Sequence, residues 1–309
     1  MEAFVLELQS RICNKLSEID GNSFKVDEWK RKEGGFGRTM VLQKGNVFEK
    51  AGCGVSVVEG TLTKEAIKQM KSRGKEISAD EVNFFAAGIS LVFHPWNPHC
   101  PTVHMNYRYF EMVDDDNKVT YWFGGGADLT PAVLYNEDAI HFHRTLKDAC
   151  TLTDHNYYDA FKNWCDTYFF IPHREEARGI GGIFFDDLTE FETLKTTPPV
   201  TGKSIDHLFS FIQDCGNAFL PAYIPIVDAR KDLPFTQEEK EWQQIRRGRY
   251  VEFNLVYDRG TKFGLYTPGA RIESILMSLP LTSSWEYMHE PPSFATELMD
   301  VLKHPKQWL

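Results

Sequence analysis

The amino-acid sequence predicts an α+β fold, built as one domain around a large, mainly antiparallel β-sheet. Segments with strand-like alternation follow one another through turns, and segments with helical periodicity are grouped around them. The chain of 309 residues contains no repeat, low-complexity tract or linker, and a hydrophobic content of 42% is enough for one large core. We therefore treat residues 1–309 as a single domain.

The predicted helices begin at the N-terminus. Apolar residues at spacings of three and four place one face of the first helix in the core, namely Phe4, Val5, Leu8, Ile12 and Leu16. This helix is expected to end near Asp20. Further helices are predicted after Thr63, after Asn136, at 207–229, at 236–246 with a capping box of Thr236 and Glu239, and at 293–303.

Aromatic-rich segments predict the strands. They lie at residues 90–93, 102–110, 119–123, 182–186 and 250–257, and several alternate with period two. The last segment leads into residues 258–261, Asp-Arg-Gly-Thr, which are typical of a hairpin turn. These segments account for the predicted sheet.

Charge and composition exclude several classes of protein. A net charge of −10 disfavours nucleic-acid binding, which depends mainly on neutralising phosphates. No apolar run approaches the roughly 20 residues that span a bilayer, and residues 1–20 are amphipathic rather than signal-like. The six cysteines contain no C-x-x-C pair, which favours free thiols in a reducing compartment. We expect a cytoplasmic protein without a transmembrane segment.

The densest group of candidate functional residues lies in 94–108. If 102–110 is a strand, His104, Asn106 and Arg108 share one face, and Val103, Met105, Tyr107 and Tyr109 share the other. An acid–base group, an amide and a fixed cation in one row suit a binding or catalytic site. The alternative is the solvated face of an antiparallel sheet.

Three glycines, 124–126, precede the carboxylate of Asp128 where a strand is expected to end. Glycines allow a flat ligand to approach the backbone, and Asp128 could accept hydrogen bonds from ligand N–H groups. The alternative is a cap or turn at Asp128. The glycines of 178–187 and 34–38 do not form a dinucleotide-binding loop, because the first set precedes a strand and the second lacks the final glycine.

Histidines raise the question of a metal site. His94, His99, His104, His141, His143 and His173 could supply imidazoles, but the sequence contains no metal-binding spacing such as His-Glu-x-x-His. His143 shares a helix face with apolar residues, so a hydrogen-bonded core histidine explains it as well as a ligand does. We expect no metal.

Five arginines lie within 26 positions of this acidic chain: Arg246, Arg247, Arg249, Arg259 and Arg271. Guanidinium groups suit forked hydrogen bonds to carboxylates. The alternative is a set of surface ion pairs. Gly269 and Arg271 stand at the start of a predicted helix, whose N–H groups also favour anions.

These residues lie within longer motifs, at 34–38, 47–52, 94–108, 123–131, 178–187, 246–261 and 267–280. In their order and over nearly the whole chain, they resemble the oxygen-dependent coproporphyrinogen III oxidase family. The resemblance implies oxidative decarboxylation of two propionates of coproporphyrinogen III to vinyls, giving protoporphyrinogen IX, CO₂ and H₂O₂ in haem biosynthesis. It also implies O₂ as co-substrate, no required cofactor, a homodimer, and a sheet flanked by helices on both faces.

The resemblance also assigns roles to residues. Ser90, Asn106, Tyr107, Arg108, Gly269, Ala270 and Arg271 match substrate-contacting motifs, with Ala270 where bacterial relatives often have glycine, and Asp258 and Arg259 of the 246–261 motif join them as candidates. His104 matches a proposed proton donor and, with Asp128 and Arg108, makes up the expected catalytic set. His94, His104, His143 and His173 match histidines that have been proposed as metal ligands in the family.

The ligand chemistry agrees with the residues. The macrocycle has pyrrole N–H donors inside and propionates outside, which a central carboxylate ringed by arginines complements. We expect Asp128 at that centre. A metal-dependent oxygenase and a non-catalytic tetrapyrrole-binding protein remain alternatives. The apolar C-terminal residues Phe294, Leu298, Val301, Leu302 and Trp308 pack either on a dimer partner or on the chain's own core.

Overall fold

A computed structural model describes the chain except residues 33, 73–81, 115–117, 192–195 and 267–268. Its centre is a seven-stranded antiparallel sheet in the order β1-β2-β3-β4-β5-β6-β9. The strands are β1 (Lys25–Lys30), β2 (Gly35–Gln43), β3 (Phe48–Thr61), β4 (Asn83–Pro95), β5 (Thr102–Val113), β6 (Val119–Thr130) and β9 (Gly182–Leu188). The first six follow chain order, so the sheet is a meander, and the predicted α+β class is confirmed.

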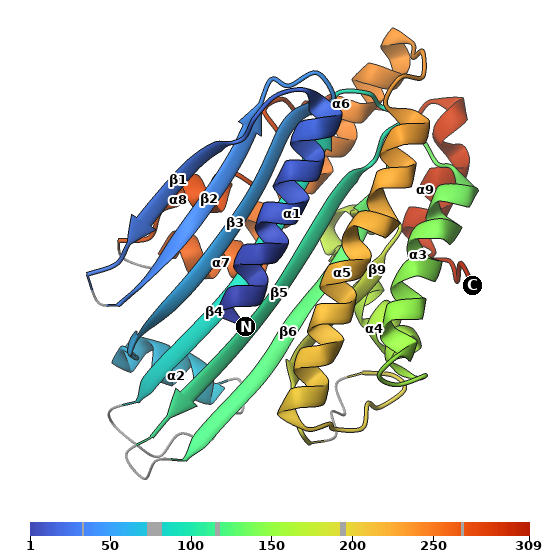
Figure 1. Cartoon of the computed structure of the whole chain (residues 1–309). Coiled ribbons are helices and arrows are strands. Elements are labelled where there is room, and N and C mark those ends of the chain that lie inside the picture. Colours follow the sequence, from blue (N-terminus) through green and yellow to red (C-terminus); the bar gives the residue numbers. More distant parts are fainter. Residues whose placement is uncertain (33, 73–81, 115–117, 192–195, 267–268) are drawn as a thin grey trace.

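Helices lie on both faces of this sheet (Figure 1). In the view of Figure 1, α1 (Glu2–Asp20) and α5 (Ile205–Arg230) lie in front, with α3 (Asn136–Thr151) and α4 (Tyr157–Tyr168) beside them. Behind the sheet lie α7 (Arg259–Tyr266) and α8 (Ile272–Leu276), which follow α6 (Gln237–Glu252). The remaining elements are α2 (Lys64–Ser72), the short strands β7 (Phe170–Ile171) and β8 (Glu176–Ala177), and α9 (Thr296–Lys303).

The main hydrophobic core lies between the sheet and the helices of the α1 face. Val5, Leu8, Ile12 and Leu16 of α1 are buried, as the predicted helical face requires. Odd-numbered residues of β5, such as Met105 and Tyr107, enter the same core. The opposite face of the sheet is therefore the one that carries polar side chains.

The C-terminal prediction of a strand at 250–257 is wrong. Residues up to Glu252 continue α6, and Phe253–Tyr257 form a π-helix. Tyr250, Phe253 and Asn254 are buried at helical spacings of three and four, and this packing overrides the β-propensity of the aromatic residues. The hairpin predicted at 258–261 is also wrong, because α7 begins at Arg259.

Other predicted boundaries need smaller corrections. The glycines 124–126 do not end a strand but lie in the middle of β6, which continues through Asp128 to Thr130. The capping box of α6 is confirmed: the Glu239 backbone N–H donates to Thr236 Oγ1 (3.2 Å), and the Thr236 N–H donates to Glu239 Oε2 (2.7 Å). No helix in the described part of the chain is both long and apolar enough to cross a membrane.

Candidate active site

The functional face is built on β5. Its side chains alternate, so that Val103, Met105 and Tyr107 are buried in the core, and His104, Asn106 and Arg108 lie half-buried on the opposite face. The predicted row is therefore present. Residues directly opposite one another in antiparallel strands face the same side, so the register extends this row across the sheet.

The register brings together residues from five strands. Asp27 of β1, Thr39 of β2, Gly54 of β3, Ser90 of β4 and Asn106 of β5 are successive cross-strand partners. The predicted substrate residues Ser90 and Asn106 therefore lie side by side on one face. Gly54 adds no side chain to this row, and the Met277 side chain packs against the β3 backbone there: a Cβ on Gly54 would lie 2.9 Å from Met277 Cε.

A hydrogen-bonded pair of a histidine and a buried carboxylate lies at one end of the functional face. His104 lies opposite Asp128 of β6, and His104 Nδ1 donates to Asp128 Oδ1 at 2.7 Å. Among the described residues, only this nitrogen of His104 has a hydrogen-bond partner, and the ring packs edge-on against Phe169. His104 Nε2 is thus the nitrogen through which the pair can exchange a proton with a ligand.

Arg178 holds the carboxylate from the other side. Its Nη2 donates to Asp128 Oδ1 at 2.9 Å and its Nε to Oδ2 at 3.1 Å, while Nη1 donates to Asn254 Oδ1 at 3.2 Å. The guanidinium also stacks on the Phe169 ring at 3.9 Å. Arg178 and Asp128 are both buried, so this is a desolvated, forked ion pair.

The pKa of Asp128 reflects these contacts. Burial acts to raise it, but the Arg178 charge and the hydrogen bond from His104 outweigh burial and hold the pKa below its ordinary value. Asp128 is therefore a carboxylate at neutral pH. Its Oδ1 accepts hydrogen bonds from His104 and Arg178, and its Oδ2 accepts one from Arg178.

A second, more open cluster surrounds Arg108. Its Nη1 donates to Asn106 Oδ1 and its Nη2 to Asp186 Oδ1, both at 2.8 Å. Asp186 also pairs with Arg259 at 3.1 Å. A Cβ on Gly124 would lie 2.8 Å from Arg108 Nη2, so this position must be glycine for Arg108 to lie across β6.

Asp258, the other candidate from the motif 246–261, lies beside this cluster. Tyr168 Oη donates to Asp258 Oδ1 at 3.0 Å, and the Arg259 guanidinium lies over the Tyr168 ring at 4.9 Å. Folding therefore brings Asn106, Arg108, Asp258 and Arg259 into one neighbourhood. Its two positive charges, on Arg108 and Arg259, are both paired with Asp186, so a ligand carboxylate would share these guanidinium groups with Asp186.

Arg271 is not close to Arg108. It precedes α8 and pairs with Asp27 of β1, beside the Trp29 ring. Four strand spacings separate β1 from β5, or about 19 Å. The two arginines stand at opposite ends of one row on one face, with Ser90 between them, and Gly269 and Ala270 lie next to Arg271.

The side chain of Tyr107 does not belong to this face. It is fully buried on the core side of β5, where burial raises its pKa well above the ordinary value. Successive residues of a strand point to opposite faces, so the motif that contains Asn106 and Arg108 carries Tyr107 into the core. The expectation that its side chain contacts substrate is not supported by this geometry.

The candidate metal ligands are spread through the fold. His94 bonds to Thr102 and to the Ser278 carbonyl, His143 to Tyr158 and the Ile180 carbonyl, and His173 to Tyr257 and Glu252. Within the described ranges, no three or more His, Cys, Asp or Glu side chains are gathered as metal ligands would be. His143 is the hydrogen-bonded core histidine that the sequence left open.

Three site residues were not singled out from the sequence. Arg178, Asp186 and Asn254 bond to predicted site residues or to one another. Arg178 and Asp186 begin and nearly end the motif 178–187, whose resemblance was noted without a role. A polar residue at each end of an otherwise glycine-rich and apolar motif is the signal that could have identified them.

The fold and site define a class of protein: an α+β protein whose antiparallel sheet carries arginine–carboxylate pairs on one face, next to a histidine bonded to a buried carboxylate. A family model described as Coproporphyrinogen III oxidase matches residues 1–308. The chain belongs to this family.

Curated relatives agree with the family match. An oxygen-dependent coproporphyrinogen-III oxidase, mitochondrial, of Rattus norvegicus is 56% identical over 314 residues, covering 100% of this chain and 68% of the relative. The oxygen-dependent enzyme of Drosophila melanogaster is 53% identical and covered to 77%, and a chloroplastic coproporphyrinogen-III oxidase 1 of Arabidopsis thaliana is 50% identical and covered to 78%. The names of the rat and Arabidopsis relatives place those proteins in organelles, so the expected cytoplasmic location stays a prediction.

Proposed function

We propose that this protein is an oxygen-dependent coproporphyrinogen III oxidase of haem biosynthesis. At each of two propionates, the propionate, one O₂ and one proton become a vinyl group, CO₂ and H₂O₂. Two electrons leave the side chain with the β-hydrogen and reduce O₂, so no separate oxidant is required. The observation that carries the proposal is the functional face, which has Arg108 and Arg259 near the His104–Asp128–Arg178 triad and Arg271 at its other end.

Each part of the face has a role in this proposal. Arg108 and Arg259 at one end and Arg271 at the other hold propionates through charge-assisted hydrogen bonds. Ser90 and Asn106 lie between them and offer polar side chains to the macrocycle. The backbone of Gly269 and Ala270 borders it beside Arg271.

The triad handles protons. His104 Nε2 faces the ligand and exchanges a proton at a pyrrole nitrogen, while Asp128 fixes the tautomer and stabilises the charged imidazole. Arg178 keeps Asp128 ionised and oriented. An electron-rich pyrrole that has lost or shared its N–H proton reacts with O₂ itself, so the protein's part is to bind, position and exclude water.

The deciding experiment is turnover of coproporphyrinogen III by purified protein, started anaerobically and then opened to air. Protoporphyrinogen should form only after O₂ is admitted, with one O₂ consumed and one CO₂ released per vinyl. A tetrapyrrole carrier would bind the substrate without O₂ uptake. A metal-dependent oxygenase would lose activity after thorough chelation and regain it with one metal, whereas we expect activity to survive chelation.

Two further properties belong to the proposal. We expect a homodimer, as the family resemblance implies. We also keep the cytoplasm as the expected compartment, which fractionation of the source cells would test directly. Recovery of the activity with an organelle fraction would overturn that expectation.

A further inference from the structure

A small, partly open cavity lies on the functional face, between α6 and the ends of β5 and β6. Thr102 of β5 and Thr130 of β6 line it and are cross-strand partners, two positions beyond the His104–Asp128 pair. Arg246, Arg247 and Tyr250 of α6 close it from the other side. All these residues are buried, and the space is on the order of one water-sized molecule.

The α6 residues that line the cavity carry hydrogen-bond donors without protein partners. Among the described residues, Arg246 Nε and Nη2, Arg247 Nε and Tyr250 Oη have none. The remaining guanidinium nitrogens are engaged, since Arg246 Nη1 donates to Glu176 and Arg247 donates to Glu49 and the Pro95 carbonyl. Buried donors of this kind are unfavourable unless a guest accepts from them.

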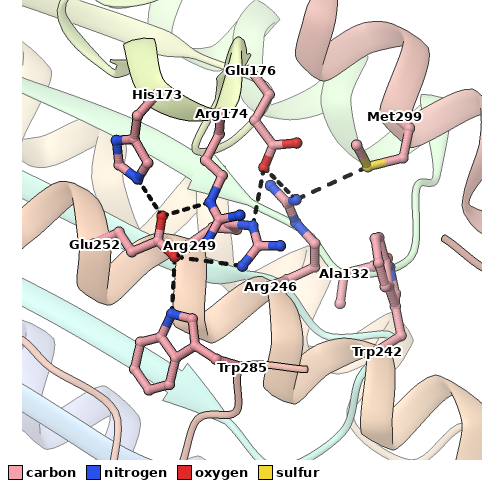
Figure 2. A network of polar contacts seen from close by, with 10 residues as sticks. All are labelled: Ala132, His173, Arg174, Glu176, Trp242, Arg246, Arg249, Glu252, Trp285 and Met299. Carbon is pink, nitrogen blue, oxygen red and sulfur yellow. Dashed lines mark hydrogen bonds and ion pairs between the residues drawn. The ribbon is translucent and has the colours of Figure 1, made fainter. Parts of the chain in front are cut away.

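The charge around the cavity is biased towards positive. Figure 2 shows Arg246 and Arg249 reaching Glu176 together, so that one carboxylate serves two guanidinium groups. Burial and then the Arg247 charge lower the pKa of Lys240 to about 8. The same two causes, in the same order, hold the pKa of His94 well below its ordinary value. The Arg247 charge therefore disfavours a further cation here, and the two buried guanidinium groups supply the positive charge that an anion would need.

A single water would satisfy only part of this site. It could donate to the Thr102 and Thr130 hydroxyls, but it accepts about two hydrogen bonds, whereas four buried atoms of Arg246, Arg247 and Tyr250 have no partner among the described residues. A halide accepts from several donors at once and has no hydrogen to place. A space of this order suits a monoatomic ion better than a polyatomic anion such as phosphate or sulfate.

We infer that the cavity is a binding site for one monoatomic anion of the chloride class, held by Arg246, Arg247 and Tyr250. The anion joins α6 to the ends of β5 and β6. It thereby stabilises the wall behind Tyr250, on which the Arg178 guanidinium rests at 4.8 Å. The site is distinct from the propionate-binding arginines, and its occupant contributes stability rather than chemistry.

Thermal unfolding of the full chain tests this inference. Melting temperatures are compared in sodium chloride, sodium bromide and sodium gluconate at one ionic strength, because gluconate is too large to enter. Chloride and bromide should raise the melting temperature saturably over gluconate, as mass action requires for an ion that binds only the folded state. Crystals soaked in bromide should show an anomalous peak in the cavity. Equal melting temperatures in all three salts would overturn the inference. Electron density in the cavity without an anomalous bromide peak would also overturn it, since the occupant would then be water.

A matched pair of variants locates the effect. Ala132 lines the cavity, and Ala295 belongs to the same small apolar cluster but does not line it. Ala132→Val should abolish the chloride-dependent rise, and Ala295→Val should keep it. If Ala132→Val does not fold, Tyr250→Phe removes one donor and should weaken the apparent chloride affinity roughly tenfold. An unchanged chloride affinity in Tyr250→Phe would contradict the proposed ligand set.

Discussion

Asp128 shows how neighbours decide what a single residue can do. The glycines before it suggested an exposed carboxylate that accepts pyrrole N–H groups. In the fold it is buried, paired with Arg178 and bonded to His104, and these contacts hold it in the charged form. Arg178 lies 50 positions away along the chain, and no local pattern connects the two residues.

Replacing Asp128 with Asn should damage chemistry more than binding. The amide keeps the shape but removes the negative charge that stabilises a protonated His104, and it leaves Arg178 without its ion pair. Since acid–base catalysis contributes roughly 10²–10⁴-fold, we expect kcat to fall at least about 100-fold with a smaller change in KM. Steady-state kinetics on coproporphyrinogen III, with circular dichroism to confirm folding, measure this. Near-wild-type kcat in a folded variant would make Asp258 the next carboxylate to test.

Removing Arg108 should instead damage binding. Arg108→Ala loses charge-assisted hydrogen bonds worth about 1.5–3 kcal/mol each, so KM should rise by roughly 10- to 150-fold while kcat changes less. Arg271→Ala should behave in the same way. Arg11→Ala is a suitable control, because Arg11 lies on α1, on the other face of the sheet, and is half-exposed. A fall in kcat without a change in KM would assign Arg108 to chemistry.

At the scale of elements, β5 could be predicted well, because alternation along it follows directly from its two different faces, whereas β1, β2 and β3 were not among the predicted strands. The residues 250–257 could not, because Val251, Phe253 and Leu255 also alternate with period two. Only the packing of Tyr250, Phe253 and Asn254 against Arg178 and Phe169 decides for a helix. That packing depends on contacts between distant segments, which local propensity does not contain.

The C-terminal segment supports the triad through the loop that carries Arg178. Trp308 Nε1 and His143 Nε2 both donate to the Ile180 carbonyl, at 3.2 and 3.1 Å. The Ile180 N–H in turn donates to the Leu129 carbonyl at 2.9 Å, next to Asp128. Trp308 and His143 are thus positioning residues for the Arg178 loop.

Trp308→Phe keeps the ring but removes its N–H. One neutral hydrogen bond is worth about 0.5–1.5 kcal/mol, so we expect kcat to fall roughly 2- to 10-fold with KM unchanged. Trp164→Phe, at a half-buried tryptophan of α4, is the matched control. A purely structural role would lower the melting temperature of Trp308→Phe but leave kcat at the wild-type value.

Glu252, the last residue of α6, links this helix to neighbouring segments through contacts that depend on pH. It accepts hydrogen bonds from Arg174, His173 and Trp285 (Figure 2). Burial acts to raise its pKa, but these bonds lower it from 4.5 to about 2. Because the folded-state pKa is depressed, its contribution to stability is present above about pH 4.5 and is lost as the pH falls towards 2.

Glu252→Gln should therefore lower the melting temperature at neutral pH and flatten its decline between about pH 5 and pH 2. Melting curves across this range measure both effects. Glu7→Gln on α1 controls for loss of an exposed carboxylate, since the Glu7 side chain is 71% exposed. A variant whose melting temperature declines as steeply as that of the wild type would contradict the assignment.

At the scale of the whole molecule, the C-terminal apolar residues pack inward. Leu298, Val301, Leu302 and Trp308 are buried in the chain's own core, and Phe294 remains partly exposed. The sequence left two alternatives for these residues, packing on a dimer partner or on the chain's own core, and the four buried residues follow the second. The expected homodimer must therefore use another surface.

Light scattering at micromolar concentration should give twice the chain mass of 35.6 kDa. A monomeric mass under these conditions would remove the homodimer from the proposal. The double substitution Leu298→Ala and Val301→Ala should lower the melting temperature without changing the mass, since both side chains face the chain's own core. A change of mass instead would return these residues to an interface.

The π-helix at Phe253–Tyr257 makes the positions of Asp258 and Arg259 depend on the number of residues in this segment. A helical residue turns the chain by about 100°, so removing the exposed Leu255 would let the segment close up as an ordinary α-helix and rotate everything after it by that angle. Arg259 would then leave Asp186, while Arg178 and Asp128 kept their contact. Substitutions at 255 should be tolerated, but a deletion there should not, and any alignment that places a gap within 253–257 predicts a different arrangement of Asp258 and Arg259.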